Sequence, residues 1–426
     1  MKSAITVLTG YEVCLPNKAA LSLLPIPKQN TLVAAAFGQK TIRLAVAAKL
    51  RNLALCAIRM HLEKLSLTNF KNYEDSRYTF GQQVNVLVGP NGSGKTNLLD
   101  AVYFLALSKS AFQSQDASSI LHDADYFIID GIFEERDDRL VQITISLQRG
   151  QRKVVMADKK PYERISEHIG RFPVVLVAPN DTDLVREHSE DRRHFFDGVL
   201  SQLDSDYLRD YLMYQQVLKQ RNSLLKLFAE RNQVDNDLLD TYDEPLLDLG
   251  QKIHDRRQQF VDDYLPTFQK HYAYLSEDRE TVSIVYESEV SNPEFADEFR
   301  HFRRRDTVLQ RTTMGIHKDD YGFMIGDRSG ESVPLKKFGS QGQQKTFVIA
   351  LKLAQFDRLE VRKGIKPILL LDDIFDKLDD RRIGKLIQRM DEGAFGQLFI
   401  TDARPERTRE LLRHVKAEVR FFEIGH

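Results

Sequence analysis

The sequence has few cysteines, no tryptophan, no long hydrophobic run and almost no net charge. Its two cysteines, Cys14 and Cys56, are too few for a disulfide framework and belong to no CxxC or Cys/His cluster of the kind that binds zinc. Because no window approaches about 18 uninterrupted apolar residues, we expect no membrane span. The formal net charge is −1, so binding of nucleic acid would need a local basic surface. A reducing, cytoplasmic location is therefore expected.

The 426 residues are enough for two or three domains, and residues 1–59 differ from the rest. This segment contains basic residues from Lys2 to Arg59 and a single acid, Glu12. A basic, acid-poor leader can be a targeting peptide. The alternative is that Met60 is the true start and the preceding residues are upstream reading frame. We favour the second interpretation, a non-native or disordered extension.

An α/β pattern begins at Met60. Residues Leu62 to Leu67 alternate between apolar and polar, which predicts a half-buried strand. The β-branched run Val84 to Val88 predicts a buried strand. Apolar residues from Leu98 to Leu105 recur at helical spacing. The order is therefore strand, glycine-rich loop and helix.

The glycine-rich loop fits the phosphate-binding pattern G-x-x-x-x-G-K-[ST]. Its glycines let backbone N–H groups surround phosphate oxygens, and the following helix directs its positive end at the same anion. The lysine should reach the β- and γ-phosphates, and the threonine hydroxyl should bind Mg²⁺. We therefore predict an ATP site formed by Gly89, Pro90, Asn91, Gly92, Ser93, Gly94, Lys95 and Thr96.

Two acids follow a second apolar run. The run Pro367 to Leu371 predicts a buried strand that ends at Asp372 and Asp373. P-loop enzymes hold Mg²⁺ with a carboxylate at such a strand end, so we assign Asp372 to the metal. Asp373 is then placed to orient or deprotonate the attacking water. A further strand is expected at Gln397 to Thr401.

A serine motif precedes a helix that we expect at Thr346 to Gln355. A serine, a glycine and a helix N-terminus can form a second anion site. The order is P-loop, serine motif and acid pair, as in ATP-binding-cassette (ABC) ATPases, where the motif of one subunit closes on nucleotide held by another. We call it the signature motif and assign it to the nucleotide through Ser340, Gln341, Gly342 and Gln343.

Roughly residues 185–305 are poor in glycine and dominated by helical periodicity. Tyr207, Tyr211, Tyr214, Leu218 and Leu225 form one stripe, which favours a helix packed against its neighbours over a ligand site. The basic run from Arg300 to Arg305 is more typical of a solvated face than of a nucleic-acid contact, which remains the alternative.

From Met60 almost to the C-terminus, the sequence resembles the RecF proteins of bacterial DNA replication and repair. The resemblance is carried by Met60–Tyr73, the P-loop, Arg192–Asp197, Leu218–Lys226, Gly315–Asp320, the signature motif and Leu371–Asp373. It implies an ATPase head similar to that of SMC proteins, two of which ATP joins into a homodimeric clamp on double-stranded and single-stranded DNA. It also implies RecR and RecO as mediator partners and slow hydrolysis that releases the clamp.

Several positions depart from the family pattern. Lys318 stands where the family usually has an arginine, which puts a bidentate contact there in doubt. Asp376 to Asp379 keeps only part of the usual Ser-Glu-Leu-Asp.

Residues that would sense or attack the γ-phosphate also depart from the pattern. Thr401 and Asp402 stand where transporter ATPases have a switch histidine, and the switch glutamine has only two candidates, Gln113 and Gln115. Asp373 is one methylene shorter than the glutamate common at its position, which favours slow turnover.

We therefore predict an α/β fold: an ABC/SMC-like P-loop ATPase head from residues 60–185 and 306–426, with an inserted helical arm at 186–305. A transporter subunit is disfavoured because its two nucleotide motifs lie only about a hundred residues apart. A long SMC tether is disfavoured because only about 120 residues are available for it. A scaffold that binds nucleotide without turnover stays open beside a weak, DNA-stimulated ATPase that acts as a switch.

Overall fold

The computed structural model describes residues 60–135, 139–327, 331–376 and 379–425. Residues 1–59, for which we expected a non-native or disordered extension, lie outside the described residues, as do Lys377 and Leu378. Along the described part of the chain, no helix combines the length and the apolar character needed to span a membrane.

A parallel five-stranded sheet forms the centre of the structure. The strand order is β14-β3-β13-β12-β8, and every neighbouring pair is parallel. All residues of β3, β13, β12 and β8 are buried, which explains why these strands are predominantly apolar. The bounds are β14 Val419–Glu423, β3 Val84–Val88, β13 Leu398–Asp402, β12 Ile368–Leu371 and β8 Val174–Val177. The expected strands at 84–88, 367–371 and 397–401 are thus confirmed.

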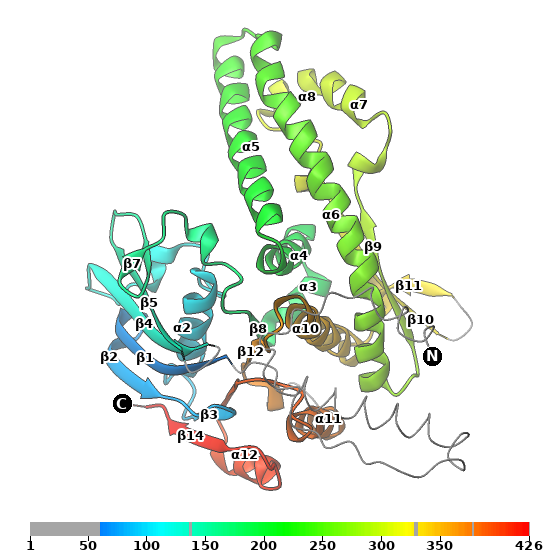
Figure 1. Cartoon of the computed structure of the whole chain (residues 1–426). Coiled ribbons are helices and arrows are strands. Elements are labelled where there is room, and N and C mark those ends of the chain that lie inside the picture. Colours follow the sequence, from blue (N-terminus) through cyan, green and yellow to red (C-terminus); the bar gives the residue numbers. More distant parts are fainter. Residues whose placement is uncertain (1–59, 136–138, 328–330, 377–378, 426) are drawn as a thin grey trace, which may run out of the picture. The chain divides into compact units, whose positions relative to one another are not determined.

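A six-stranded antiparallel sheet packs on one side of this centre, with helix α2 (Lys95–Leu107) between them (Figure 1). Phe104 of α2 meets Phe70 and Phe127 of this sheet edge to face, at centroid distances of 6.0 and 5.5 Å. The strands are β2 Tyr73–Thr79, β1 His61–Phe70, β4 Tyr126–Glu134, β5 Leu140–Gln148, β6 Val154–Ala157 and β7 Lys160–Pro161. The expected strand at 62–67 and the helix after the P-loop are confirmed.

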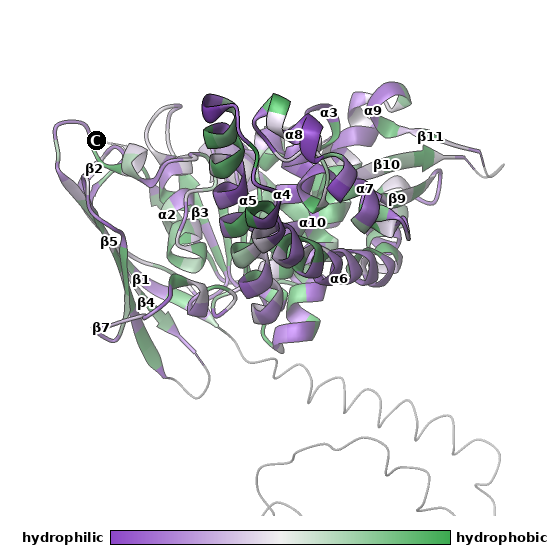
Figure 2. Cartoon of the chain, turned by 90° about the horizontal axis from the view of Figure 1, so that it is seen from above, coloured by the Kyte–Doolittle hydropathy of each residue, from purple (hydrophilic) through white to green (hydrophobic). Residues whose placement is uncertain are grey.

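Two long helices, α5 (Ser205–Arg231) and α6 (Asn236–Ser276), run side by side as an antiparallel pair (Figure 1). With α7 (Phe295–His301) and α8 (Arg303–Leu309) they form what we call the arm. The expected tyrosine and leucine stripe is the packed face of α5, since Tyr207, Tyr214, Leu218 and Leu225 are buried. Seen from above, α6 is largely hydrophilic while β3 is largely hydrophobic (Figure 2).

A strand interrupts the segment that helical periodicity dominated. β9 (Thr281–Glu287) follows α6 and pairs with β10 (Asp320–Gly326), which pairs with β11 (Ser332–Pro334). The alternation of apolar and polar residues in β9 could have indicated it. The remaining helices are α3 Asp183–Arg186, α4 Ser189–Leu203, α9 Leu335–Phe338, α10 Gln341–Lys363, α11 Asp380–Asp391 and α12 Pro405–Leu412. Short 3-10 turns are η2 Asp116–Ser119, η4 Ile165–Glu167, η5 Pro179–Thr182, η6 Glu289–Ser291, η7 Ile316–Lys318 and η8 Ile374–Asp376.

A buried arginine attaches α6 to the segment Gly315–Asp320. The side chain of Arg257 is 1% exposed and pairs with Asp197 at 2.9 Å and Asp319 at 2.7 Å. It also donates to the Ile316 carbonyl at 2.8 Å. Removing one partner from such a buried pair would leave an uncompensated charge, which is strongly destabilising. The base of the arm is therefore firmly joined to the strands beside it.

The basic run from Arg300 to Arg305 is only partly a solvated face. Arg303 pairs with Asp240 and, at 2.7 Å, with Asp243, and thereby holds α8 against α6. The Arg305 guanidinium lies 5.4 Å from the centroid of the Phe302 ring. A nucleic-acid contact by this run stays a prediction, but Arg303 is already engaged within the arm.

Two buried histidines predict a loss of stability in mild acid. Burial lowers the pKa of both His168 and His317 to about 4, so each is neutral in the folded protein. The unfolded chain takes up these protons near pH 6.5, so their contribution is complete above that pH and is lost as the pH falls toward 4. We expect the free energy of unfolding to fall by roughly 3 kcal/mol for each histidine over this interval.

Denaturant titrations at several pH values between 4 and 7 measure this effect. His317→Gln should flatten the pH dependence, because a carboxamide can keep bonds to Tyr214 and Thr312 without titrating. His122→Gln is the matched control, since His122 is exposed and should leave the slope unchanged. Equal slopes in all three proteins would contradict the assignment.

Candidate nucleotide-binding site

The P-loop joins the end of β3 to the start of α2. Gly89 lies so close to the C-terminal segment that a Cβ atom there would come within 2.1 Å of the Ile424 carbonyl oxygen. Gly94 caps α2 with φ 104°, a conformation that residues with a side chain rarely adopt. Both positions therefore need glycine. The hydroxyl of Ser93 is buried and, among the described residues, has no hydrogen-bond partner, so the loop offers a donor that a phosphate oxygen would satisfy.

The lysine amine is held at this loop. Lys95 Nζ donates to the carbonyl oxygens of Gly89 and Pro90, at 2.8 Å each. Burial lowers the pKa of Lys95, while the negative charges of nearby carboxylates act in the opposite direction. Those carboxylates belong to Asp373, Asp372 and Asp402. A cation between phosphate-facing glycines and strand-end acids suits a nucleotide with a bound metal ion.

The first acid and the P-loop threonine are in direct contact. Thr96 Oγ1 lies 3.0 and 3.1 Å from the two carboxylate oxygens of Asp372. Thr401 Oγ1 donates to the same carboxylate at 2.7 Å. Burial raises the pKa of Asp372, and the hydrogen bonds from Thr401 and Thr96 oppose that shift.

This donor set fits magnesium. A hydroxyl and a carboxylate are hard oxygen ligands, and Mg²⁺ is usually held by one or two protein groups together with phosphates and water. Within residues 60–135, 139–327, 331–376 and 379–425, no cluster of three or more His, Cys, Asp or Glu side chains could hold a metal. The metal assignment of Thr96 and Asp372 stays a prediction that their contact supports.

The second acid sits on an unusual backbone turn. Asp373 has φ 48°, in the left-handed region that aspartate and asparagine tolerate better than most residues. Its backbone N–H donates to Thr401 Oγ1 at 2.8 Å, and its side chain is only partly buried. Thr401 thus bridges the two acids, a role that the sequence did not indicate because it depends on β13 lying next to β12.

Two further residues support the loop from β2 and the preceding turn. Tyr73 donates its hydroxyl to the Gly94 carbonyl at 3.0 Å. Asn97 Nδ2 donates to Asn72 Oδ1 at 2.7 Å, and Asn72 Nδ2 reaches the Ser93 carbonyl at 3.5 Å. In the sequence, Asn72 and Tyr73 belong to the segment that resembles the RecF family, and no local signal links them to the P-loop.

The signature motif forms the start of α10. Ser340 is the N-cap: its Oγ accepts from the Gln343 N–H at 3.2 Å, and the Gln343 side chain accepts from the Ser340 N–H at 2.6 Å. This capping box starts the helix at Gln341, so the expected start at Thr346 was wrong. Glycine and three glutamines had hidden the helical period there.

The structure brings the P-loop, Asp372 and Asp373 together but not the signature motif. Ser340, Gly342 and Gln343 line an open pocket of about 240 Å³, whose other walls come from α6, residues 277–280 and the start of α11. None of residues 89–96 lines it. Ser340 and Gln341 are exposed. Within one chain, then, the two halves of the expected ATP site face different surroundings.

The two switch-glutamine candidates differ in burial. Its loop is tied to α2, because the Asp100 carboxylate accepts from Ser110 Oγ and the Ala111 N–H, each at 2.7 Å. The carboxamide oxygen of Gln113 is buried and has no partner in the described part of the chain. Gln115 is exposed. The assignment of Gln113 as the switch glutamine stays a prediction.

Asp402, in the place of a switch histidine, has a structural partner. Its carboxylate accepts from Thr408 Oγ1 at 2.5 Å and from the Arg404 N–H at 2.8 Å, and so orients the start of α12.

A family model described as the RecF/RecN/SMC N terminal domain matches residues 61–420. Over 365 residues the chain is 45% identical to the DNA replication and repair protein RecF of Flavobacterium johnsoniae, which covers 86% of this chain and 100% of that protein. The chain belongs to the RecF family. The RecF protein of Cytophaga hutchinsonii is 46% identical, across 86% of this chain and 95% of its own length.

A solved structure of a RecF protein agrees with this membership. It is a recombination mediator protein, RecF with ATP, of the RecFOR pathway. It matches the RecF-family chain with a TM-score of 0.75 and 26% identity, over 87% of this chain and 99% of its own length. The expected ABC/SMC-type ATPase fold is thereby confirmed.

Proposed function

We propose that this RecF-family chain is a DNA clamp in which ATP joins two copies, and in which slow hydrolysis of ATP releases them. As a RecF protein it binds ATP and acts in DNA replication and repair. One observation carries the proposal of a dimer: Lys95 lies near the two acids at the C-terminal end of β12, whereas Ser340 lines a separate open pocket. A nucleotide on the P-loop would therefore meet the signature motif of a second copy.

Within one copy, the P-loop would hold the phosphates. Residues Gly89 to Thr96 supply backbone donors and the positive end of α2, and Lys95 supplies a cation for the β- and γ-phosphates. Thr96 and Asp372 would hold Mg²⁺, which neutralises phosphate charge when bound. Asp373 would orient or deprotonate the attacking water from the same sheet edge.

Across the dimer, the start of α10 would contact the γ-phosphate. The capping box holds Ser340 at the helix N-terminus, where backbone N–H groups and the helix dipole favour an anion. Ser340, Gln341, Gly342 and Gln343 of one copy would complete the site built on Lys95 of the other. Each bound ATP would then contact both copies and stabilise the dimer.

DNA and mediator proteins follow from the family. RecF relatives are named for DNA replication and repair, and the solved RecF–ATP structure belongs to the RecFOR pathway. We propose double-stranded and single-stranded DNA as ligands and RecR and RecO as partners. We also propose that DNA stimulates the hydrolysis of ATP and that the clamp assists recombinase loading at gapped DNA in the cytoplasm.

Sedimentation with and without ATP and DNA tests the proposal. We expect a monomer in buffer, an increase to dimer mass with ATP and Mg²⁺, and a DNA-bound dimer when duplex DNA is added. ADP in place of ATP is the control and should leave the monomer, because it lacks the γ-phosphate that would join the copies. A monomer at saturating ATP and DNA would refute the clamp.

A further inference from the structure

Helix α6 connects the arm to the signature helix α10. Its C-terminal half packs along α10, where the rings of Phe268 and Phe347 lie 4.7 Å apart between centroids. The hydroxyl of Tyr264 also bonds to the Leu351 carbonyl in α10. Because a packed helix moves as a rigid body, a movement of the arm would shift α6 and, through this packing, would displace α10.

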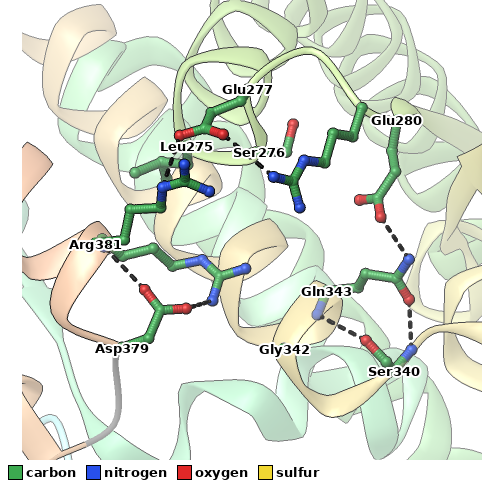
Figure 3. A pocket seen from close by; sticks show the side chains of 11 residues that line it. Leu275, Ser276, Glu277, Glu280, Ser340, Gly342, Gln343, Asp379 and Arg381 are labelled. Atoms are coloured by element: carbon green, nitrogen blue, oxygen red, sulfur yellow. Dashed lines mark hydrogen bonds and ion pairs between the residues drawn. The ribbon is translucent and has the colours of Figure 1, made fainter.

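At the end of α6, a chain of hydrogen bonds continues to Ser340. Tyr272 donates its hydroxyl to Glu280 Oε2 at 2.5 Å, and Gln343 Nε2 donates to Glu280 Oε1 at 2.7 Å. Gln343 Oε1 in turn accepts from the Ser340 N–H at 2.6 Å. Figure 3 shows Glu280, Gln343 and Ser340 in line on one wall of the open pocket. Both oxygens of Glu280 are thus used by neutral donors.

The carboxylate of Glu280 decides which way the Gln343 carboxamide faces. An ionised carboxylate only accepts hydrogen bonds, so Gln343 must turn its NH₂ group toward Glu280. Its oxygen is then left facing the Ser340 N–H, as the capping box requires. If the Gln343 carboxamide were reversed, its oxygen would face the Glu280 carboxylate, which also only accepts. Its NH₂ group would face the Ser340 N–H, which also only donates. Glu280 therefore fixes the conformation of the signature motif from outside it.

The neighbouring charges of the pocket are otherwise engaged. Glu277 pairs with Arg381 at 3.0 Å (Figure 3) and with Lys385 at 3.3 Å. Arg382 pairs with Asp379. The Glu277 pairs join the end of α6 to α11, whereas the Arg382–Asp379 pair lies within the start of α11. Glu280 thus bonds to α6 through Tyr272 and to the signature motif through Gln343, in addition to the direct packing of α6 on α10.

We propose that Glu280 is a positioning residue that couples the arm to the signature motif, through Tyr272 on one side and Gln343 on the other. The proposal rests on the proposed function, in which Ser340 closes on the nucleotide of a second copy. A shift of α6 relative to α10 would then alter the presentation of Ser340 and so the stability of the ATP-bound dimer.

Glu280→Ala and Glu280→Gln test the coupling. Alanine leaves the Gln343 carboxamide without its partner, and we expect ATP-dependent association to weaken about tenfold in sedimentation. Glutamine can still accept from Gln343 and donate to Tyr272, so it should restore most of that loss. ATP binding by the monomer and the thermal unfolding midpoint should match the unmodified chain in both variants.

A matched pair of tyrosine variants isolates the α6 side. Tyr272→Phe keeps the buried ring but removes the donor to Glu280, and it should weaken association roughly threefold. Tyr274→Phe makes the same change two residues later, where the hydroxyl lies 3.4 Å from the Lys385 carbonyl in α11, and it should have no effect. Equal behaviour of the two variants would overturn the link through Tyr272.

Ser340→Arg separates this inference from the proposed function. If Ser340→Arg abolishes ATP-dependent association while Glu280→Ala associates like the unmodified chain, the clamp stands and the coupling is overturned. If Ser340→Arg also associates normally, the trans role of Ser340 fails and the coupling fails with it. A Glu280→Ala loss that glutamine does not restore, together with a lower unfolding midpoint, would assign Glu280 a role in stability and overturn the coupling.

Discussion

Replacing Asp373 by asparagine should lower the rate of ATP hydrolysis by a factor of about 10²–10⁴, while ATP and DNA binding persist. The carboxylate follows β12 and lies near Lys95, in the position where we propose that it orients or deprotonates water. Asparagine removes the proton acceptor but keeps the size of the side chain. ATP-bound dimers should consequently last longer.

The backbone favours this substitution over others. Asp373 has φ 48°, and asparagine adopts that left-handed region readily, so Asp373→Asn should keep the turn and its bond to Thr401. Alanine would confound loss of the base with backbone strain. Asp130→Asn is the matched control: Asp130 accepts from Gln142 and Thr144 on the antiparallel sheet, away from the loop, and its replacement should leave hydrolysis unchanged.

Single-turnover hydrolysis at saturating ATP, with and without DNA, gives the measurement. An unchanged rate in Asp373→Asn would mean that another group orients the water. If the unmodified chain itself shows no turnover under any condition, the alternative of a nucleotide-binding scaffold takes the place of the switch.

Lys95→Ala and Ser340→Arg should each abolish ATP-dependent association, yet recover part of it when mixed. Lys95→Ala removes the cation at the phosphates and should weaken ATP binding more than about 100-fold. Ser340→Arg should still bind ATP as a monomer, because Ser340 is exposed and lines a pocket to which no P-loop residue contributes. Its bulk would instead block the approach of a second copy.

The mixture decides whether the site is shared. A heterodimer has one composite site with both lesions and one with neither, so sedimentation and hydrolysis should regain part of the lost signal. If each site were completed within one chain, every site in the mixture would carry one of the two substitutions. ATP-dependent association and hydrolysis would then not recover. Lys95→Ala alone at twice its concentration is the control, because it matches the total protein concentration of the mixture.

The P-loop and the strand end at Asp372, which form the proposed nucleotide-holding half of the site, could be predicted from neighbouring residues. These features lie within a short stretch of chain: the mainly apolar strand β3, the glycines and lysine of the P-loop, and the helically spaced apolar residues of α2. The strand that ends at Asp372 is equally local. Such features depend on backbone conformation and on burial of a continuous run, and both are encoded where they occur.

The start of α10 and the strand β9 also had local signals, which stronger patterns obscured. The capping box of Ser340 and Gln343 marks a helix start, but the polar run after it suggested a loop. β9 alternates between apolar and polar residues for one strand only, after a helix of 41 residues. Short strands of this kind gain their stability from a partner, here β10.

Other features were decided only when distant segments met. Thr401 bridges Asp372 and Asp373 because β13 lies beside β12, and strand order is set by packing of the whole sheet rather than by local periodicity. Arg303 looked like part of a free basic run, yet its carboxylate partner Asp243 is 60 residues away. The sequence by itself thus determined that a glycine-rich loop lies between a buried strand and a helix, and it predicted that this loop holds a nucleotide. Tertiary structure decided which side chains support them and that Ser340 faces elsewhere, because those contacts join segments that no local pattern connects.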